Sequence, residues 1–504
     1  MKKVIIIGGG IGGLALANLL AKKGNDVHVF EKNEQLGGRA GERKVKGFTF
    51  DAGPSWYLMP DVFKDYFSLF DIDVTKELSI KRLRPGYKVF FESHKSVIVR
   101  GDIEKDSASF EAIESGAGKA LRRYVDEGDY IYQMALKNFL YTDFSRLHQL
   151  VKGEILAGSA KLFTLLATPI HSRVKKFVKS PQLQQILEYP MVFLGTSPFK
   201  APAMYSLMSA LDFKEGVYYP AGGMYSIIRL MVSLGKSLGV THHINTEVKK
   251  ITHVAGRATG VVLGDGSIVA ADIVVSNGDL HHTETKLLSP EAQSYPARFW
   301  DKKEAGISAL LIYVGVKGSL PQLEHHNLYF VDAWKENFAD IYAKKKIPKS
   351  ASLYVSRTSS TDPTTAPKGH ENLFFLVPLP TGVPLSKAQQ AKLADHFIGE
   401  FGKAIGEPDL IGRVVLKDLF GPADFKERFY AWRGTALGMS HLLGQSALWR
   451  IPPKSKKLKN LYYVGGNTMP GIGLPMCLIS AELAYKKIVG NPRPGPLRGM
   501  KKGW

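Results

Sequence analysis

Short runs of apolar residues alternate with glycine turns and with segments of helical spacing along most of the chain. Residues 3–7 form a β-branched run that ends at glycine, which is typical of a buried parallel strand. Residues 14–23 have helical character and end at Gly24, and residues 25–30 form a second apolar run. This order predicts a strand, a helix and a second strand, which is the repeating unit of an α/β protein with a parallel sheet.

The same patterns predict further elements. Apolar runs on either side of the Ser93-His94-Lys95 turn predict one hairpin, and the Gly264-Asp265-Gly266 turn predicts another. Helical spacing covers residues 119–151, 226–238, 387–401 and 476–489. Further apolar runs predict a second sheet and a last strand near the C-terminus, at residues 307–316, 328–331, 352–357, 372–377 and 458–464.

Composition and charge narrow the class of protein. The chain has 504 residues, 44% hydrophobic and 22% charged, so we expect a globular protein of two or three domains. Its 67 Lys and Arg against 46 Asp and Glu give a net charge of +21, which indicates nucleic acid, an acidic membrane surface or a phosphorylated ligand as partner. A single cysteine, Cys477, excludes an internal disulfide and a cysteine-cluster metal site. The apolar runs are too short for a signal peptide or a spanning helix.

The turn after the first strand carries a dinucleotide-binding pattern. Gly8, Gly10 and Gly13 give the spacing G-x-G-x-x-G between strand and helix, where a tight turn lets a pyrophosphate approach the helix N-terminus. Glu31 ends the second strand, where a carboxylate accepts hydrogen bonds from ribose hydroxyls. Because strand, glycines, helix, strand and acid follow in order, the sequence predicts a dinucleotide site.

Two more glycine-rich segments extend this site. The turn at 37–40 places backbone N–H groups and one guanidinium near the second face of the pyrophosphate, and this extended pattern resembles FAD-binding flavoproteins of the amine-oxidase superfamily. The cofactor residues predicted in this part are Gly38, Arg39, Gly53, Pro54 and Ser55.

The C-terminal turn at 465–475 runs from an apolar strand into a helix whose N-terminus presents free N–H groups. A flavin needs such a positive end where negative charge collects on reduction. The cofactor residues predicted here are Gly465, Gly466, Gly471, Gly473, Leu474 and Pro475.

With these motifs the chain resembles the bacterial-type phytoene desaturases of the carotenoid desaturase family over nearly its whole length. The matching segments are 8–13, 37–40, 48–55, 219–224, 271–277, 445–447 and 460–473. The resemblance implies FAD as the sole redox cofactor, a long polyene-precursor substrate and peripheral attachment to a membrane. In the wider superfamily the strand after the 226–238 helix presents a backbone group to adenine, which implies this role for Val248. Asn467, Met469 and Gly466 depart from the residues usual at their positions.

We therefore predict an α/β protein with a discontinuous Rossmann-like FAD-binding domain, a substrate domain of mixed sheet plus helices, and a helical segment that associates with a membrane. The predicted FAD-binding parts are residues 1–100, 215–285 and 451–490. The helical segment covers 101–214, the substrate domain 286–450, and a flexible basic tail 491–504.

The implied reaction removes a hydride and a proton from adjacent carbons of an alkyl chain. We expect the flavin N5 to take the hydride, so the protein needs an apolar tunnel and one base for the proton. Candidates for the base are Asp143 with Arg146, three apart on one predicted helix face, and His441. The histidine pairs at 242–243, 281–282 and 325–326 lack the spacing of a metal site and are interpreted as surface residues.

The expected function is FAD-dependent desaturation of phytoene to lycopene-type products in carotenoid biosynthesis. A C30 dehydrosqualene desaturase, and a flavin-dependent carotenoid isomerase or saturase on the same fold, are the alternatives. A non-enzymatic prenyl-binding protein is a third reading, which predicts no bound flavin. The electron acceptor, oxygen or quinone, and the oligomeric state stay open.

Part of the positive charge has a place in the sequence. Residues 146–200 contain eight bases and two acids, interleaved with apolar residues, which suits an anionic membrane surface. Nucleic acid is not expected as a partner, because no nucleic-acid-binding motif accompanies the charge. We expect a cytoplasmic protein that associates peripherally with the cell membrane.

Overall fold

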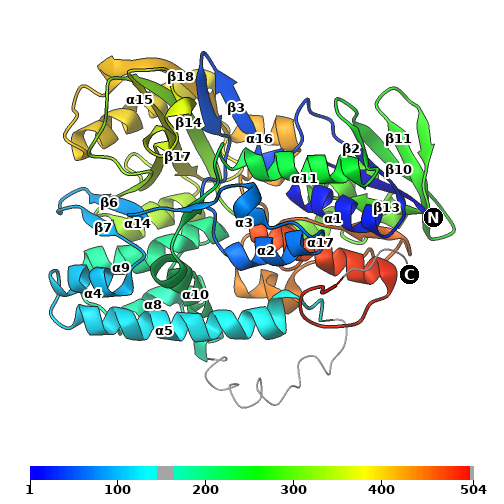
Figure 1. Cartoon of the computed structure of the whole chain (residues 1–504), viewed down its shortest axis with the longest axis horizontal. Coiled ribbons are helices and arrows are strands. Elements are labelled where there is room, and N and C mark those ends of the chain that lie inside the picture. The colour runs from blue at the N-terminus through cyan, green and yellow to red at the C-terminus, as the bar shows by residue number, and fades with distance from the viewer. Residues whose placement is uncertain (145–163, 500–504) are drawn as a thin grey trace.

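The computed structural model describes residues 1–144 and 164–499. These residues form two main sheets and a layer of helices (Figure 1). One sheet lies at the right of the view near the N-terminus, the second lies at upper left, and helices fill the lower left. Among the described residues, no helix combines the length and the apolar character needed to cross a bilayer.

The first sheet is parallel and joins segments that lie far apart in the sequence. Its strand order is β19-β13-β1-β2-β9. The register sets Ile5 beside Val274, and Val274 beside Leu461. The bounds are β1 Lys3–Ile7, β2 Asp26–Phe30, β9 Thr241–His243, β13 Ile273–Ser276 and β19 Leu461–Tyr463. The prediction of an α/β fold with a parallel sheet is confirmed.

Helix α1 (Ile11–Lys22) lies between α11 (Tyr225–Ser237) and α17 (Leu474–Val489), as Figure 1 shows. Eleven of its twelve residues are buried, which requires a helix that is apolar on all faces. It begins three residues before the predicted start, because the glycines at 12 and 13 already belong to its first turn. The loop that precedes it therefore ends directly at a helix N-terminus.

The predicted hairpin at Gly264-Asp265-Gly266 is confirmed and forms part of a small antiparallel sheet. Its strands are β10 Val248–Val254, β11 Arg257–Leu263 and β12 Ile268–Ala270, in the order β10-β11-β12. In Figure 1 this sheet projects at the right, beyond the parallel sheet.

The second sheet has seven strands in the order β18-β14-β17-β16-β15-β6-β7. Helix α15 (Lys387–Ala404) packs on it and begins with a capping box in which Ser386 and Gln389 bond each other's backbone. The strands are β6 Tyr87–Phe91, β7 Val97–Val99, β14 Ser308–Lys317, β15 His326–Phe330, β16 Leu353–Ser356, β17 His370–Leu379 and β18 Val414–Phe420. The mixed sheet of the predicted substrate domain is thus present, and the hairpin β6–β7 joins it through a parallel pairing with β15.

A layer of helices covers the lower part of the molecule in Figure 1. Its members are α4 Ile103–Glu111, α5 Ala117–Ala135, α8 Ile170–Val174, α9 Pro181–Glu188 and α10 Leu207–Ala210. The predicted helix over 119–151 is too long: α5 ends at Ala135, a wider helical turn follows over Leu136–Leu140, and residues 142–144 are not helical. Residues 145–163 of the predicted helical segment 101–214 lie outside the described residues.

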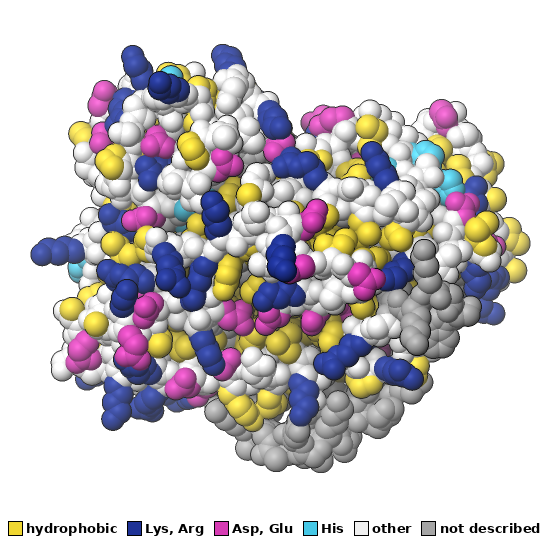
Figure 2. All heavy atoms as spheres, in the orientation of Figure 1, with side chains coloured by type: hydrophobic (Ala, Val, Ile, Leu, Met, Phe, Trp, Pro, Cys, Tyr) yellow, Lys and Arg dark blue, Asp and Glu magenta, His cyan; other side chains and the backbone are white. Residues whose placement is uncertain are grey.

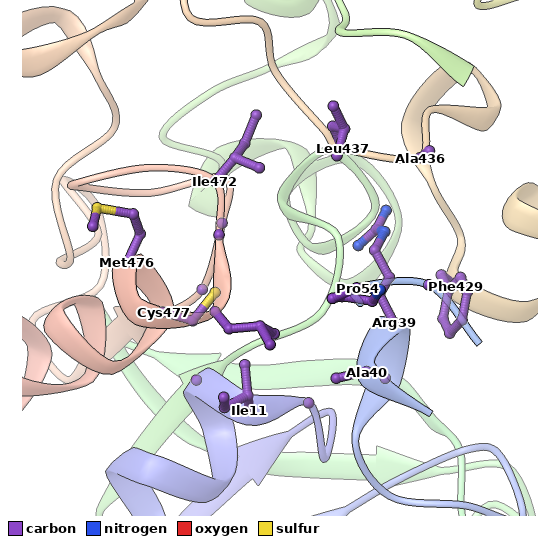
Figure 3. Close-up of a pocket in the computed structure, with 18 of the residues that line it drawn as sticks. Ile11, Arg39, Ala40, Pro54, Phe429, Ala436, Leu437, Ile472, Met476 and Cys477 are labelled. Atoms are coloured by element: carbon purple, nitrogen blue, oxygen red, sulfur yellow. The ribbon is translucent and has the colours of Figure 1, made fainter. Parts of the chain in front are cut away.

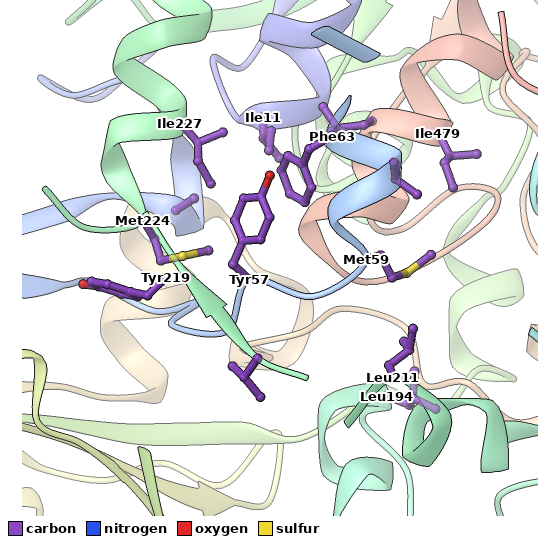
Figure 4. Close-up of a cluster of buried hydrophobic side chains, with 14 of the residues drawn as sticks. Ile11, Tyr57, Met59, Phe63, Leu194, Leu211, Tyr219, Met224, Ile227 and Ile479 are labelled. Carbon is purple, nitrogen blue, oxygen red and sulfur yellow. The ribbon is translucent and has the colours of Figure 1, made fainter. Parts of the chain in front are cut away.

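The largest core cluster lies where the parallel sheet, the second sheet and the helical layer meet. Figure 4 shows Ile11 of α1 and Ile227 of α11 near Tyr57, whose ring stacks on Phe63 at 4.4 Å, and Ile479 of α17 farther along the same cluster. Short elements that complete this region and its surroundings are β3 Glu42–Val45, β4 Phe48–Asp51, β5 Lys81–Arg82, β8 Tyr218–Tyr219, α2 Pro60–Ser68, α3 Val74–Glu77, α12 Leu280–His282, α13 Ala297–Asp301, α14 Trp334–Phe338 and α16 Pro422–Phe429.

The C-terminal tail was predicted to be flexible, but its described part packs against α17. The buried Glu482 carboxylate accepts a hydrogen bond from the Leu497 backbone N–H at 2.7 Å, and the Lys486 ammonium donates to the Gly495 carbonyl. Leu497 itself is buried. Two polar side chains of a mostly apolar helix thus bind the backbone of the tail. Sequence composition alone does not reveal such hydrogen bonds.

The charged side chains do not form one dominant patch on the face shown in Figure 2. Lys and Arg are spread over this face with Asp and Glu between them. In the basic segment of the helical layer, Arg173 is paired with Glu127, with Arg173 Nε donating to Glu127 Oε1 at 3.0 Å. Lys175 and Lys176 are exposed. The described bases of this segment therefore present fewer free charges than their number implies.

Candidate functional site

One cavity of about 1070 Å³ connects the glycine-rich turns to the helical layer. Its wall includes residues from all three predicted cofactor segments. Figure 3 shows Arg39, Pro54 and Phe429 on one side of this space and Ile472, Met476 and Cys477 on the other. The two ends of the chain therefore build one site.

The first glycine loop leaves no room for a side chain at its key positions. A Cβ on Gly13 would lie 2.4 Å from the Gly8 carbonyl oxygen, and a Cβ on Gly10 would lie 2.9 Å from the Asn277 amide nitrogen. The backbone of Gly8 is itself fixed, since its N–H donates to the Phe30 carbonyl at 2.8 Å. The loop thus directs the N-terminus of α1 toward the cavity, as a pyrophosphate site requires.

Glu31 lies at the end of β2 and is buried beside this loop. Its Oε2 accepts a hydrogen bond from the Gly9 N–H at 2.9 Å, and its Oε1 accepts from the Asn33 N–H at 2.9 Å. Val248, predicted to contact adenine through its backbone, begins β10 and lines the same part of the cavity. The structure therefore brings these two predicted residues together with Gly8 and Gly10.

Asn277 is a cofactor-site residue to which the sequence reasoning gave no role. It follows β13, donates from Nδ2 to the Gly8 carbonyl at 3.0 Å, and lines the cavity. Its Oδ1 would lie 2.8 Å from a Cβ on Gly465, so it stands between the first and the last glycine turns. Asn277 belongs to the segment 271–277 that carries the family resemblance. Its role was not visible in the sequence, because its contact partners lie far away along the chain.

The second segment supplies a half-buried cation, Arg39. Arg39 donates from Nη2 to the Thr435 carbonyl at 3.3 Å, while its buried Nε has no partner. Burial lowers the pKa of Arg39 and raises that of the nearby Asp279. Gly38, Gly53, Pro54 and Ser55 line the cavity beside it. A half-buried cation next to an open cavity, with a buried N–H left unbonded, fits an anionic group such as a pyrophosphate.

The third segment forms the turn between β19 and α17. Gly473 has a φ of 122° and Gly471 a φ of 149°, which are backbone conformations that favour glycine. Helix α17 begins at Leu474 with Pro475 in its first turn, as predicted. All six predicted residues of this turn line the cavity except Gly471, which lies against His441. The free N–H groups of this helix end therefore face the space that a flavin ring would need.

His441 is buried against this turn. Its Nε2 accepts a hydrogen bond from the Ile472 N–H at 3.2 Å, and its Nδ1 lies 3.2 Å from the Tyr205 hydroxyl. The Tyr205 hydroxyl donates to Ser446 Oγ at 3.1 Å. Burial holds the pKa of His441 well below its usual range, so the ring is neutral. The structure places this candidate base in the cavity wall, where it also fixes the backbone of the 465–475 turn.

Asp143 does not lie on a helix, because the helical segment that precedes it ends at Leu140. Asp143 forms an ion pair with Lys487 at 2.5 Å and is only 13% exposed. Its neighbours Thr142 and Phe144 line the large cavity, whereas Asp143 itself lies in a small adjoining hollow. Arg146 lies outside the described residues. An acid that is paired on α17 is poorly placed to take a proton from a ligand in the large cavity.

One of the three histidine pairs, at 325–326, differs from its predicted surface location, whereas the pairs at 242–243 and 281–282 are half-buried. His325 and His326 are 4% and 0% exposed, and His326 stacks on Trp56 at 4.5 Å while its Nδ1 lies 2.8 Å from the Tyr354 hydroxyl. The interpretation as surface residues was therefore wrong for this pair. Within residues 1–144 and 164–499, no cluster of His, Cys, Asp or Glu could hold a metal ion.

Because His325 and His326 are buried, we expect the protein to lose stability in acid. Burial lowers the pKa of His325 to about 3 and that of His326 well below its usual value. Below pH 6.5 the unfolded chain binds protons on these two rings that the folded protein does not bind. The free energy of unfolding is therefore highest above pH 6.5 and falls as the pH falls, by roughly 1.4 kcal/mol per pH unit for each histidine. Urea unfolding of His326→Phe between pH 6 and pH 4 should therefore show a weaker pH dependence than the wild type. The exposed-site variant His94→Gln serves as control, and equal slopes for wild type and His326→Phe would contradict this expectation.

Cys477 lines the cavity in the first turn of α17. Burial raises the pKa of its thiol to about 12, so it stays protonated.

The sequence pattern of the family described as flavin containing amine oxidoreductase matches residues 11–488, and the chain belongs to this family. It is 40% identical over 488 residues to a carotenoid 3,4-desaturase of Haloarcula japonica, covering 96% of this chain and 98% of that protein. It is 31% identical to a zeta-carotene-forming phytoene desaturase of Myxococcus xanthus, covering 97% and 94%.

Solved structures agree on the fold. Putrescine oxidase bound to putrescine superposes with a TM-score of 0.64 at 14% identity, covering 97% of this chain and 99% of that one. The chain is an FAD-dependent oxidoreductase, and the glycine loop, Glu31, Arg39 and the α17 N-terminus are the groups that would hold FAD. When bound, FAD supplies two-electron oxidation by accepting a hydride.

Proposed function

We propose that this protein desaturates a long isoprenoid hydrocarbon of carotenoid biosynthesis, converting phytoene toward lycopene-type products. The observation that carries the proposal is the single cavity, which continues from the FAD-binding turns into a space walled by apolar residues of the helical layer. These residues include Tyr132, Ala135, Phe139, Leu140, Leu166, Phe193, Met204, Leu207, Met208 and Leu211. These described residues include no charged side chain, so this part of the wall suits a hydrocarbon chain better than a charged substrate such as an amine.

The reaction determines which groups the protein must supply. Desaturation breaks two C–H bonds on adjacent carbons and forms one C=C bond, with the hydride leaving to the oxidant and the proton to a base. Of the two candidate bases, His441 lines the large cavity, whereas Asp143 is paired with Lys487 in the adjoining hollow. Both His441 ring nitrogens are engaged, Nε2 by the Ile472 N–H and Nδ1 by the Tyr205 hydroxyl, so a proton transfer to His441 requires one of these contacts to open.

A second candidate differs in the position of the new double bond. The relative from Haloarcula japonica is named a carotenoid 3,4-desaturase, and its 40% identity favours desaturation near the end of an already conjugated chain. The same scaffold thus suits either early desaturation of phytoene or late desaturation of a coloured carotenoid. A C30 substrate such as dehydrosqualene fits the cavity chemistry equally.

Expression in pigment-accumulating cells separates these substrates. Cells that accumulate phytoene, dehydrosqualene or lycopene would each express the wild-type chain, and their extracts would be compared by chromatography with absorption spectra. We expect a longer-wavelength product in at least one strain, because each added double bond lengthens the chromophore. Isomerisation would change retention without net oxidation. No product in any strain from a protein that carries FAD would overturn the proposal.

We also propose that the protein works in the cytoplasm at the membrane surface, with oxygen or a quinone as electron acceptor. A water-insoluble substrate supports this location, as does the net charge of +21. Fractionation of cells expressing the chain tests it, with recovery in the membrane pellet and release by high salt or detergent as the expected result. Full recovery in the supernatant at low salt would contradict it.

A further inference from the structure

Three large apolar side chains are exposed together on one short segment. Leu443, Leu448 and Trp449 are 40%, 44% and 56% exposed, and we call them the apolar rim. All three also line the large cavity. The other exposed large apolar residues of the described chain, among them Tyr130, do not line it. The apolar rim is therefore a place where the cavity wall continues onto the outer surface.

The exposure of the apolar rim is built into the fold. The buried Arg450 guanidinium donates to the Gln445 carbonyl at 3.4 Å and to the Gly466 carbonyl at 2.5 Å, so it ties the segment to the cofactor turn. The Gln445 amide bonds both the N–H and the carbonyl of Glu304, at 2.8 and 3.0 Å. Because these hydrogen bonds anchor the segment, its apolar side chains are exposed by the fold itself and not by local fraying.

Ala447, between the anchors, adds a local cost. Its φ is 48°, in the left-handed region that alanine rarely adopts. Such a conformation is strained and persists only where the surroundings impose it. The backbone is thus held in a shape that carries Leu448 and Trp449 at the surface.

A basic side chain flanks the apolar rim. The Lys303 ammonium donates to the Gly444 carbonyl at 3.4 Å, next to Leu443 in the chain. Lys303 therefore places a positive charge directly beside a segment whose exposed large side chains, Leu443, Leu448 and Trp449, are apolar. This combination complements a surface that is apolar inside and negatively charged at its boundary.

We propose that the apolar rim inserts into the interface of a lipid bilayer, with Lys303 at the headgroups, so that the cavity opens into the membrane. Tryptophan favours this interface because its ring is apolar while its N–H stays hydrogen bonded. The bilayer as partner rests on the proposed function, since an apolar substrate then reaches the cavity without crossing water. The location differs from the basic 146–200 segment that the sequence indicated.

The test uses the FAD-loaded full chain and vesicle flotation. The variant Leu443→Ser/Leu448→Ser/Trp449→Ser is compared with Val254→Ser/Ile268→Ser/Ile411→Ser, which removes three exposed apolar side chains away from the cavity. Vesicles contain phosphatidylcholine alone or with 30% phosphatidylglycerol. We expect the rim variant to bind both kinds at least tenfold more weakly, while the control variant binds like the wild type. FAD absorbance confirms that each variant is folded.

A second measurement locates the membrane contact directly. Lipids brominated near the headgroup should quench the tryptophan emission of the wild type, and most of this quenching should be missing in Trp449→Phe. Wild-type binding by the rim variant, or unchanged quenching in Trp449→Phe, would overturn the proposal, as would self-association through the rim in the absence of lipid. If Lys175→Gln/Lys176→Gln alone abolishes binding, the 146–200 segment is the contact instead.

Failure of the proposed function gives a different result. The wild-type chain is assayed for desaturation with substrate in detergent micelles, where docking on a bilayer is not needed. Product in micelles together with rim-independent vesicle binding removes only the docking proposal. Rim-dependent vesicle binding without product from any carotenoid removes only the proposed substrate.

Discussion

Replacing Gly13 with alanine is expected to give a protein that no longer retains FAD. The new Cβ would lie 2.4 Å from the Gly8 carbonyl oxygen, a backbone atom that cannot move freely because Asn277 Nδ2 donates to it at 3.0 Å. Relief requires a shift of the first turn of α1, whose N–H groups are the predicted pyrophosphate donors. We expect FAD affinity to fall by about 100-fold or more, which is about 2.7 kcal/mol.

The flavin absorbance of purified protein and a fluorescence titration with FAD measure this effect. Gly264→Ala is a matched control, because a Cβ there meets only ordinary contacts at 3.7 Å or more. Since Gly13→Ala also strains the fold, Glu31→Gln provides a second variant of nearly unchanged size. It replaces the carboxylate that accepts the Gly9 N–H with a neutral amide, and about tenfold weaker binding is expected. Wild-type FAD content in both variants would show that the cofactor lies elsewhere.

The parts of this site that could be predicted from sequence are those set by local backbone chemistry. A turn that needs a positive φ or a close approach requires glycine, so Gly8, Gly10, Gly13 and Gly473 were visible without the structure. The strand and helix on either side of each turn have their own periodicity. Together these signals predicted three separate segments, and the structure shows that they line one cavity.

The residues that sequence reasoning missed or misplaced depend on distant partners. His326 is buried because Trp56 covers its ring and Tyr354 bonds its Nδ1, and nothing in its own segment shows this. The β6–β7 hairpin was predicted correctly as a hairpin, but its pairing with β15 joins it to the second sheet. Asp143 was predicted on a helix because the apolar spacing continues past Ala135. In the structure the helix widens after Ala135 and ends at Leu140.

Replacing Ala135 with tryptophan is expected to stop desaturation while leaving FAD in place. Ala135 ends α5 and lines the apolar part of the cavity, away from the glycine turns. An indole ring at this position occupies space that a hydrocarbon chain needs, and a packed interior accommodates such an addition only at a cost of about 1–3 kcal/mol. Turnover should fall at least about tenfold, equivalent to about 1.4 kcal/mol in the barrier.

The matched control for Ala135→Trp is Tyr130→Trp. Tyr130 lies on the same helix but is 50% exposed and does not line the cavity, so tryptophan there should change neither FAD content nor turnover. Product formation per bound FAD, measured in micelles, separates a blocked substrate path from lost cofactor. Because Ala135 and the apolar rim both line the one cavity, a blocked path should leave vesicle binding intact. Unchanged turnover in Ala135→Trp would mean that the substrate reaches the flavin along another wall of the cavity.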